Sequence, residues 1–224
     1  MFAVSREQVS FFKKNLYISF EGLFLPTSCK ELKHLLEKSL AERLDTPASR
    51  LEQKPNIDLF TSGYDLHLVD DKIRKFSHKP KLSNLAQNLF DTPLIRFGFS
   101  QYLMTTSDPT APFKENLPFS TSCCLSPLLG LLLINLSEVH GLLAPFSLPQ
   151  QPGSALFLSP DFPFPWKEIF SMSHSHFFLV GFAGNKTFFR AETPDPLAYE
   201  LKKLGYAFND LLHEPLHPLL HTPF

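Results

Sequence analysis

The chain has few of the features that mark disulfide-rich or membrane-spanning proteins. Its 224 residues include three cysteines, Cys29, Cys123 and Cys124, with no Cys-x-x-Cys pair. Neighbouring cysteines rarely bridge each other because disulfide geometry disfavours it, so we expect free thiols. The longest apolar run, residues 127–136, is shorter than the roughly 20 residues of a membrane helix. No apolar stretch follows a basic N-terminus, so we expect no signal peptide, no membrane contact and a cytoplasmic location.

The net charge is also small. It is formally −1, which gives no reason to expect nucleic acid or acidic lipid as a partner. The charges are unevenly spread, because 16 of the 21 lysines and arginines precede Asn116. Residues 117–159 contain a single charged side chain, Glu138. We therefore predict that this middle stretch forms the core.

Several catalytic signatures are missing. The sequence has no glycine-rich phosphate loop, no Gly-x-Ser-x-Gly elbow and no His-Glu-x-x-His helix. It also has no internal repeat and no low-complexity segment. These absences remove the usual sequence evidence for nucleotide binding, serine hydrolysis or zinc proteolysis.

The N-terminal segment predicts a helix, a strand and a second helix. Ser5 with Gln8, and Ser28 with Glu31, have capping-box spacing, in which side chains satisfy the free amides at a helix start. Between them, residues 16–20 alternate apolar and polar side chains, as a half-buried strand does.

The rest of the chain predicts a strand-rich core followed by a closing helix. Helices are expected at residues 70–76 and 80–90, loops at 45–62 and 105–116, and strands at 94–104, 127–136, 141–148, 154–159, 176–182 and 187–191. Thr193 should cap a last helix that ends at Gly205. We predict one α+β domain, with a mainly helical part (1–93), a core of strands (94–191), and a closing helix and tail (192–224).

Three segments carry a resemblance to a known family. Residues 11–26 (FFKKNLYISFEGLFLP), 81–97 (KLSNLAQNLFDTPLIRF) and 151–155 (QPGSA) occur in that order. The sequence resembles the phytanoyl-CoA dioxygenase-like branch of the Fe(II)- and 2-oxoglutarate-dependent oxygenases. The resemblance implies a double-stranded β-helix (a cupin-like jelly-roll), flanked by N-terminal helices and a C-terminal helix.

The resemblance also implies an iron site, which the sequence does not supply. The family holds Fe(II) with a His-x-Asp pair and a distal histidine. Here Ser120 falls at the histidine and Ser122 at the aspartate, and protonated hydroxyls are weak ligands. The expected place of the distal histidine, residues 180–182, is apolar. Arg190 and Gln101 are candidates for a vestigial 2-oxoglutarate site. We therefore expect no metal at the two serines, and no cofactor.

Three functional hypotheses follow. The first is a non-catalytic or strongly diverged protein that binds a small molecule or a protein, or regulates. The second is an active oxygenase with a displaced site that uses His174, His176 and Arg190, and would need Fe(II) and 2-oxoglutarate. The third is a partner- or nucleic-acid-binding protein acting through its basic N-terminal half, where the cluster is Lys72, Arg74, Lys75, Lys79 and Lys81.

Two further groups have competing interpretations. Cys123 and Cys124 could be buried small side chains, or a nucleophile activated by His140 or Arg190. The C-terminal histidines recur every four residues, but prolines between them rule out a continuous helix, which favours a packed or frayed tail. They are His213, His217 and His221.

Overall fold

The computed structural model describes residues 4–138, 148 and 150–220. The helical elements are α1 (Arg6–Asn15), α2 (Pro26–Arg43), the 3-10 helix η1 (Ala48–Gln53), α3 (Asn56–Ser62), the 3-10 helix η2 (Leu66–Leu68), α4 (Asp71–Ser77), α5 (Pro80–Phe90), α6 (Phe119–Ser122), α7 (Trp166–Ser171) and α8 (Leu197–Lys203). The strands are β1 (Tyr17–Phe20), β2 (Arg96–Met104), β3 (Leu125–Asn135), β4 (Ala155–Leu158) and β5 (His176–Phe189).

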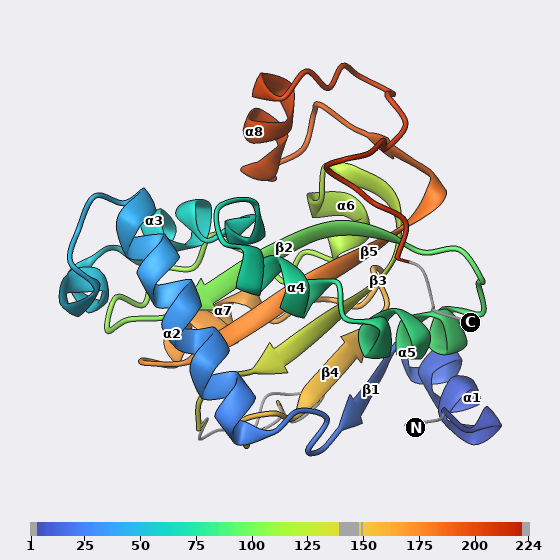
Figure 1. The fold of residues 1–224 in the computed structure, drawn as a ribbon, viewed down its shortest axis with the longest axis horizontal. Helices are drawn as coiled ribbons and strands as arrows, with labels where there is room; N and C mark the ends of the chain where they lie inside the picture. Colours follow the sequence, from blue (N-terminus) through green and yellow to red (C-terminus); the bar gives the residue numbers. More distant parts are fainter. Residues whose placement is uncertain (1–3, 139–147, 149, 221–224) are drawn as a thin grey trace.

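The strands form one antiparallel sheet in the order β1-β4-β3-β5-β2 (Figure 1). The last strand, β5, lies between β2 and β3, so the centre of the sheet pairs segments far apart in the sequence. The jelly-roll expectation requires two facing sheets. Within the described residues the structure contains one sheet, and the mixed helix-and-sheet class is the part of the prediction that is confirmed.

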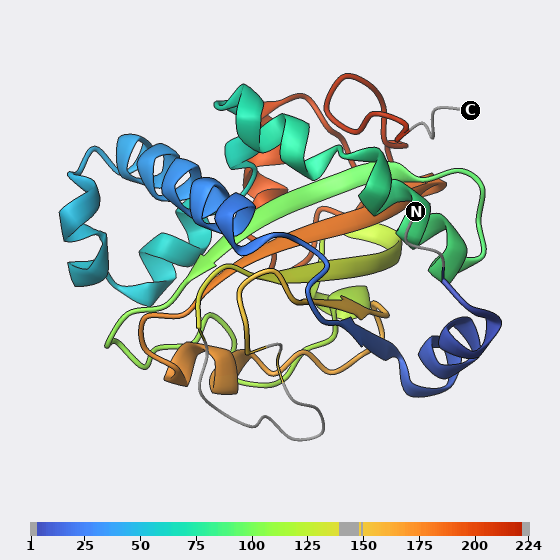
Figure 2. The same ribbon diagram turned by 60° about the horizontal axis from the view of Figure 1, so that its bottom comes forward.

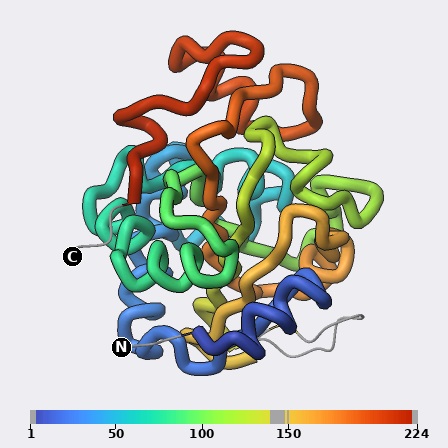
Figure 3. Tube along the Cα trace, turned by 90° about the vertical axis from the view of Figure 1, so that its right-hand side faces the viewer, coloured from blue at the N-terminus to red at the C-terminus, as the bar shows by residue number. Residues whose placement is uncertain are grey.

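Different elements pack on the two faces of the sheet. Helices α2, α4 and α5 pack on one face, while α6, α7 and long connections lie on the other (Figures 1 and 2). Figure 3 shows the same layers from the side. Strand β5 is apolar at successive positions, with Phe178 and Val180 on the helical side and Phe177 and Leu179 opposite. A strand covered on both faces has this continuous apolar pattern.

Local signals located some helix ends and missed others. The Ser5 capping box is present, with the Ser5 hydroxyl accepting from the Gln8 amide at 3.2 Å. The Ser28 cap is wrong, because α2 begins at Pro26 after Leu25 and has no side-chain cap. Proline suits the first turn of a helix, since its missing amide would lack a partner there anyway. Helices α4 and α5 and strand β2 confirm the predicted elements to within two residues.

Three other predictions are wrong in part. The loop expected at residues 45–62 contains η1 and α3, anchored by buried Leu51, Leu59 and Phe60. The strands expected at 176–182 and 187–191 are one strand, β5. The last helix begins after Pro196 rather than after Thr193. Most of the strand expected at 141–148 lies outside the described residues. None of the described helices is long and apolar enough to cross a membrane.

Candidate functional site

The two serines assigned to the iron ligands lie on a short helix rather than on a strand. Helix α6 follows Pro118, and the Ser122 hydroxyl donates to the Pro118 carbonyl at 3.0 Å. The Ser120 amide donates to the Pro160 carbonyl at 2.9 Å. Two hydroxyls, one of them committed to a backbone carbonyl, do not fit Fe(II), which favours imidazole and carboxylate ligands.

The sheet face beside α6 is filled by aromatic side chains. The Trp166 ring lies 4.3 Å from the Phe164 ring and 5.3 Å from the Phe119 ring, measured between centroids. Its indole nitrogen donates to the Leu117 carbonyl at 3.1 Å. Phe177 and Phe189 of β5 belong to the same buried cluster. This face of the sheet is therefore packed with aromatic side chains. We call the whole buried apolar cluster on this face the inner core.

Arg190, at the end of β5, forms hydrogen bonds with α6 and the segment that follows it. Its backbone amide donates to the Cys124 carbonyl at 2.7 Å. Its guanidinium donates to the carbonyls of Ser120, at 3.0 Å, and Cys123, at 2.7 Å. A partly buried guanidinium requires hydrogen-bond acceptors, and these backbone carbonyls supply them. Its role in a vestigial 2-oxoglutarate site stays a prediction.

Gln101 lies on β2 between two residues of the inner core, Phe99 and Leu103. Its side-chain amide nitrogen donates to the Phe60 carbonyl at 3.2 Å. Its side-chain oxygen is buried without a hydrogen-bond partner. The 2-oxoglutarate role predicted for this residue is likewise untested.

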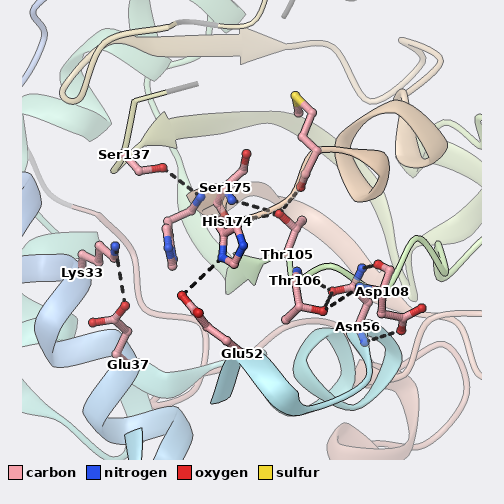
Figure 4. A network of polar contacts seen from close by, with 12 residues as sticks. Lys33, Glu37, Glu52, Asn56, Thr105, Thr106, Asp108, Ser137, His174 and Ser175 are labelled. Carbon is pink, nitrogen blue, oxygen red and sulfur yellow. Dashed lines mark hydrogen bonds and ion pairs between the residues drawn. The ribbon is translucent and has the colours of Figure 1, made fainter. Parts of the chain in front are cut away.

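The structure gives His174 and His176 separate partners. The His174 ring faces Glu52, with 3.3 Å between Nδ1 and the carboxylate (Figure 4). The His176 ring is buried and lies 2.7 Å from the Tyr102 hydroxyl. Burial lowers the pKa of His176 to about 3. Neither histidine belongs to a group of three metal-ligating side chains in the part of the chain that is described.

Two members of the basic cluster bind other groups of the protein. Lys81 donates to the Leu23 carbonyl at 2.6 Å, and Arg74 pairs with Asp71 at 2.6 Å.

The C-terminal histidines within the described residues also contact other parts of the protein. His217 is buried with Nδ1 2.8 Å from the Gly98 carbonyl, and His213 stacks on Tyr206. His140 and His221 lie outside the described residues.

A buried polar cluster was not predicted from the sequence. The sulfur atoms of Cys123 and Cys124 and a carboxylate oxygen of Asp195 all lie within 4.8 Å of one another. The Asp195 carboxylate accepts from the amides of Cys124, at 2.9 Å, and Leu197, at 3.0 Å. Burial raises the pKa of the Cys123 thiol. Asp195 was missed because it lies 71 residues from Cys124, and only the fold joins them.

Beside this cluster a groove separates α8 from η2 and from the ends of α2 and α3. Its volume is about 720 Å³. The polar part of the lining includes Arg43, Tyr64 and Asp65. The apolar part includes four residues that are 47–65% exposed, namely Leu68, Val69, Tyr199 and Leu204. We call this feature the α8 groove.

Asp65 is the most perturbed acid in the groove. Burial raises its pKa to about 7, although the Ser100 amide, 2.8 Å from the carboxylate, and the charge of Arg43 oppose the shift. The Arg43 guanidinium also donates to the Ser62 carbonyl at 3.0 Å and to the Tyr64 carbonyl. The groove therefore has a carboxyl group that titrates near neutral pH beside a fixed positive charge.

Comparison with known proteins identifies the fold. No family model and no curated protein matches this sequence. The α-ketoglutarate-dependent carbocyclase SnoK from nogalamycin biosynthesis has a TM-score of 0.71 at 14% identity, over 96% of each chain. The epimerase SnoN in complex with Fe3+, α-ketoglutarate and nogalamycin RO has a TM-score of 0.61 at 14% identity, covering 95% of this chain and 97% of SnoN.

A third similar structure is CytC3 with Fe(II) and α-ketoglutarate. Its TM-score is 0.58 at 14% identity, covering 83% of this chain and 79% of CytC3. Sequence identities this low support a statement about fold alone. The chain has the fold of the Fe(II)- and 2-oxoglutarate-dependent oxygenase-like proteins.

Proposed function

We propose that this protein is a non-catalytic, phytanoyl-CoA dioxygenase-like member of the Fe(II)/2-oxoglutarate oxygenase-like fold. In this proposal it has lost the metal motif and acts as a ligand-binding or regulatory protein. The observation that supports the proposal is that serines, Ser120 and Ser122, stand where the resemblance to the family places two of the iron ligands. Hydroxyls cannot supply the imidazole and carboxylate donors that hold Fe(II) in this family.

The packing around α6 supports the same conclusion. The Ser122 hydroxyl donates within its own turn, and Arg190 donates to the adjacent carbonyls. Aromatic rings of the inner core fill the neighbouring space. A small molecule would therefore find a better site in the α8 groove, which combines half-exposed apolar side chains with Arg43 and Asp65.

Iron binding and turnover test the proposal. We expect the purified protein to bind no stoichiometric Fe(II) that depends on 2-oxoglutarate, and to form no succinate in the presence of oxygen. The measurements are anaerobic calorimetry and quantification of succinate. Stoichiometric binding of Fe(II) together with 2-oxoglutarate, or succinate production by the wild-type protein, would refute the proposal.

Restoring the ligands tests the assignment of the positions. The variant Ser120→His/Ser122→Asp should acquire Fe(II) affinity if these positions correspond to the family site. The matched control is Thr121→His/Ser122→Asp, which adds the same groups but moves the imidazole by one residue to an exposed position. Equal iron binding by the two variants would show that the register of this assignment is wrong.

A further inference from the structure

The cluster of Cys123, Cys124 and Asp195 combines two thiols and a carboxylate in a dry environment. Their residues are 2%, 0% and 6% exposed. The three donor atoms are within 4.8 Å of one another, which is close enough to share one ion. Cysteine sulfur and carboxylate oxygen are both among the ligands that hold Zn2+ in proteins. Neither the fold comparison nor the proposed function assigns a role to this cluster.

Backbone groups already hold the donors in position. The Leu125 amide points to the Cys123 sulfur at 3.4 Å, and the Asp195 carboxylate accepts from the amides of Cys124 and Leu197. Arg190 fixes the same segment through the carbonyls of both cysteines. Hydrogen bonds to ligand atoms and their neighbours orient metal ligands and tune their donor strength.

The local charges also balance with a divalent ion. Two thiolates and one carboxylate carry three negative charges, and Zn2+ would compensate two of them. The Arg190 guanidinium lies 2.7 Å from the Cys123 carbonyl and supplies the remaining positive charge. Burying an uncompensated charge is costly, and the metal-bound form has the same neutral total as the metal-free form with protonated thiols, so binding the ion buries no additional net charge.

We propose that Cys123, Cys124 and Asp195 form a Zn2+ site beneath the α8 groove. Tyr64 belongs to the same buried side-chain cluster as Cys123 and Cys124. A tetrahedral ion has a fourth position, which a further side chain or a water molecule would occupy. Tyr64 and Leu197 also line the groove, and the Leu197 amide donates to Asp195, so the groove borders the cluster. Binding replaces the two thiol protons, which pass to solvent, with two sulfur–zinc bonds.

A purely structural role makes a different prediction. In that case the thiols stay protonated, and Asp195 anchors α8 to the start of β3 by accepting from the backbone amides of Cys124 and Leu197. The two roles differ in whether a metal displaces the thiol protons. The difference is measurable by spectroscopy.

The experiment uses the reduced protein, stripped with a chelator and titrated anaerobically with Co2+ as a probe for Zn2+. We expect thiolate-to-cobalt charge-transfer absorption that saturates at one equivalent and disappears when Zn2+ is added. Cys123→Ser and Cys124→Ser should abolish the absorption. Asp195→Asn should weaken binding by about tenfold or more. The control is Cys29→Ser, which changes the third buried cysteine and should leave the titration unchanged.

A second measurement covers variants that fail to fold. In the wild-type protein, Zn2+ should slow alkylation of Cys123 and Cys124 but not of Cys29, measured by peptide mass spectrometry. Absence of thiolate–cobalt absorption in the wild-type protein, or equal Zn2+ protection of all three cysteines, overturns the proposal. This inference stands apart from the proposed function, because the iron test follows 2-oxoglutarate dependence and the zinc test follows the thiols.

Discussion

Single residues connect segments that lie far apart in the sequence. Arg190 joins the end of β5 to the Ser120 and Cys123 carbonyls, 70 and 67 residues away. Its Nε is buried without a hydrogen-bond partner. The guanidinium is thus held by backbone oxygens rather than by a carboxylate side chain.

The first prediction concerns Arg190→Ala. Removing the guanidinium leaves the two carbonyls without this donor, so we expect destabilisation by about 1–3 kcal/mol. The measurement is the urea dependence of unfolding. Lys186→Ala, at an exposed position on the same strand, is the control and should change stability by less than about 0.5 kcal/mol. A change of that small size in the Arg190 variant would contradict this account.

The same variant also tests the vestigial cosubstrate site. If Arg190 binds a small carboxylate, 2-oxoglutarate should stabilise the wild-type protein and not the alanine variant. If its only role is to bind backbone carbonyls, 2-oxoglutarate should affect neither protein. Stability in the presence and absence of 2-oxoglutarate separates the two roles.

Elements far apart in sequence form the α8 groove. Leu68 of η2 and Leu204 after α8 lie on its lining and are 47% and 50% exposed. Half-exposed apolar side chains gathered around a concavity are typical of ligand sites. The groove forms only when α8 is held against the rest of the molecule, which the bonds of Asp195 help to ensure.

The second prediction is that a neutral, apolar fluorescent dye such as Nile red binds in this groove. Leu68→Lys or Leu204→Lys should weaken binding by about tenfold, since the contact of one leucine contributes about 1.5 kcal/mol. The control is Leu94→Lys, because Leu94 is 51% exposed but does not line the groove. Equal loss of dye binding in all three variants would show that the dye reports general surface apolarity.

The whole molecule contains several buried histidines that stay neutral. Burial lowers the pKa of His67 and His176 to about 3, and that of His78 and His217 to about 4. The unfolded chain takes up these protons below about pH 6.5, whereas the folded protein does not. Their contribution to stability is complete above pH 6.5 and is lost as the pH falls towards 4. Asp65 acts in the opposite sense, because its raised pKa favours the folded state at acidic pH.

The third prediction follows from this balance. Near pH 5, unfolding should take up about three protons. The free energy of unfolding should therefore fall by about 4 kcal/mol for each unit by which the pH is lowered. Urea unfolding between pH 7 and pH 4.5 measures the slope. His217→Gln should lower the number of protons taken up on unfolding by about one, which makes the slope shallower. The control for the substitution itself is His34→Gln, at an exposed position of α2. A stability that is constant from pH 7 to pH 5 would be incompatible with neutral buried histidines.

Interactions between near neighbours in sequence were predictable. The capping box at Ser5, the extent of α5 and the alternation in β2 depend on residues within a few positions of one another. The errors also have local causes. Prolines at positions 47 and 55 favour a loop when the sequence is considered alone, yet both directly precede helix starts, where proline is well tolerated.

By itself, the sequence determined most of the helices and strands, the apolar character of the middle stretch and the hydroxyl side chains at Ser120 and Ser122. The tertiary structure alone decided that β5 lies between β2 and β3, that Asp195 meets the two cysteines, and that α8 borders a groove. The physical reason is the range of the interactions. Helix caps and strand alternation depend on adjacent residues, whereas sheet order and buried polar clusters depend on which distant segments share one core.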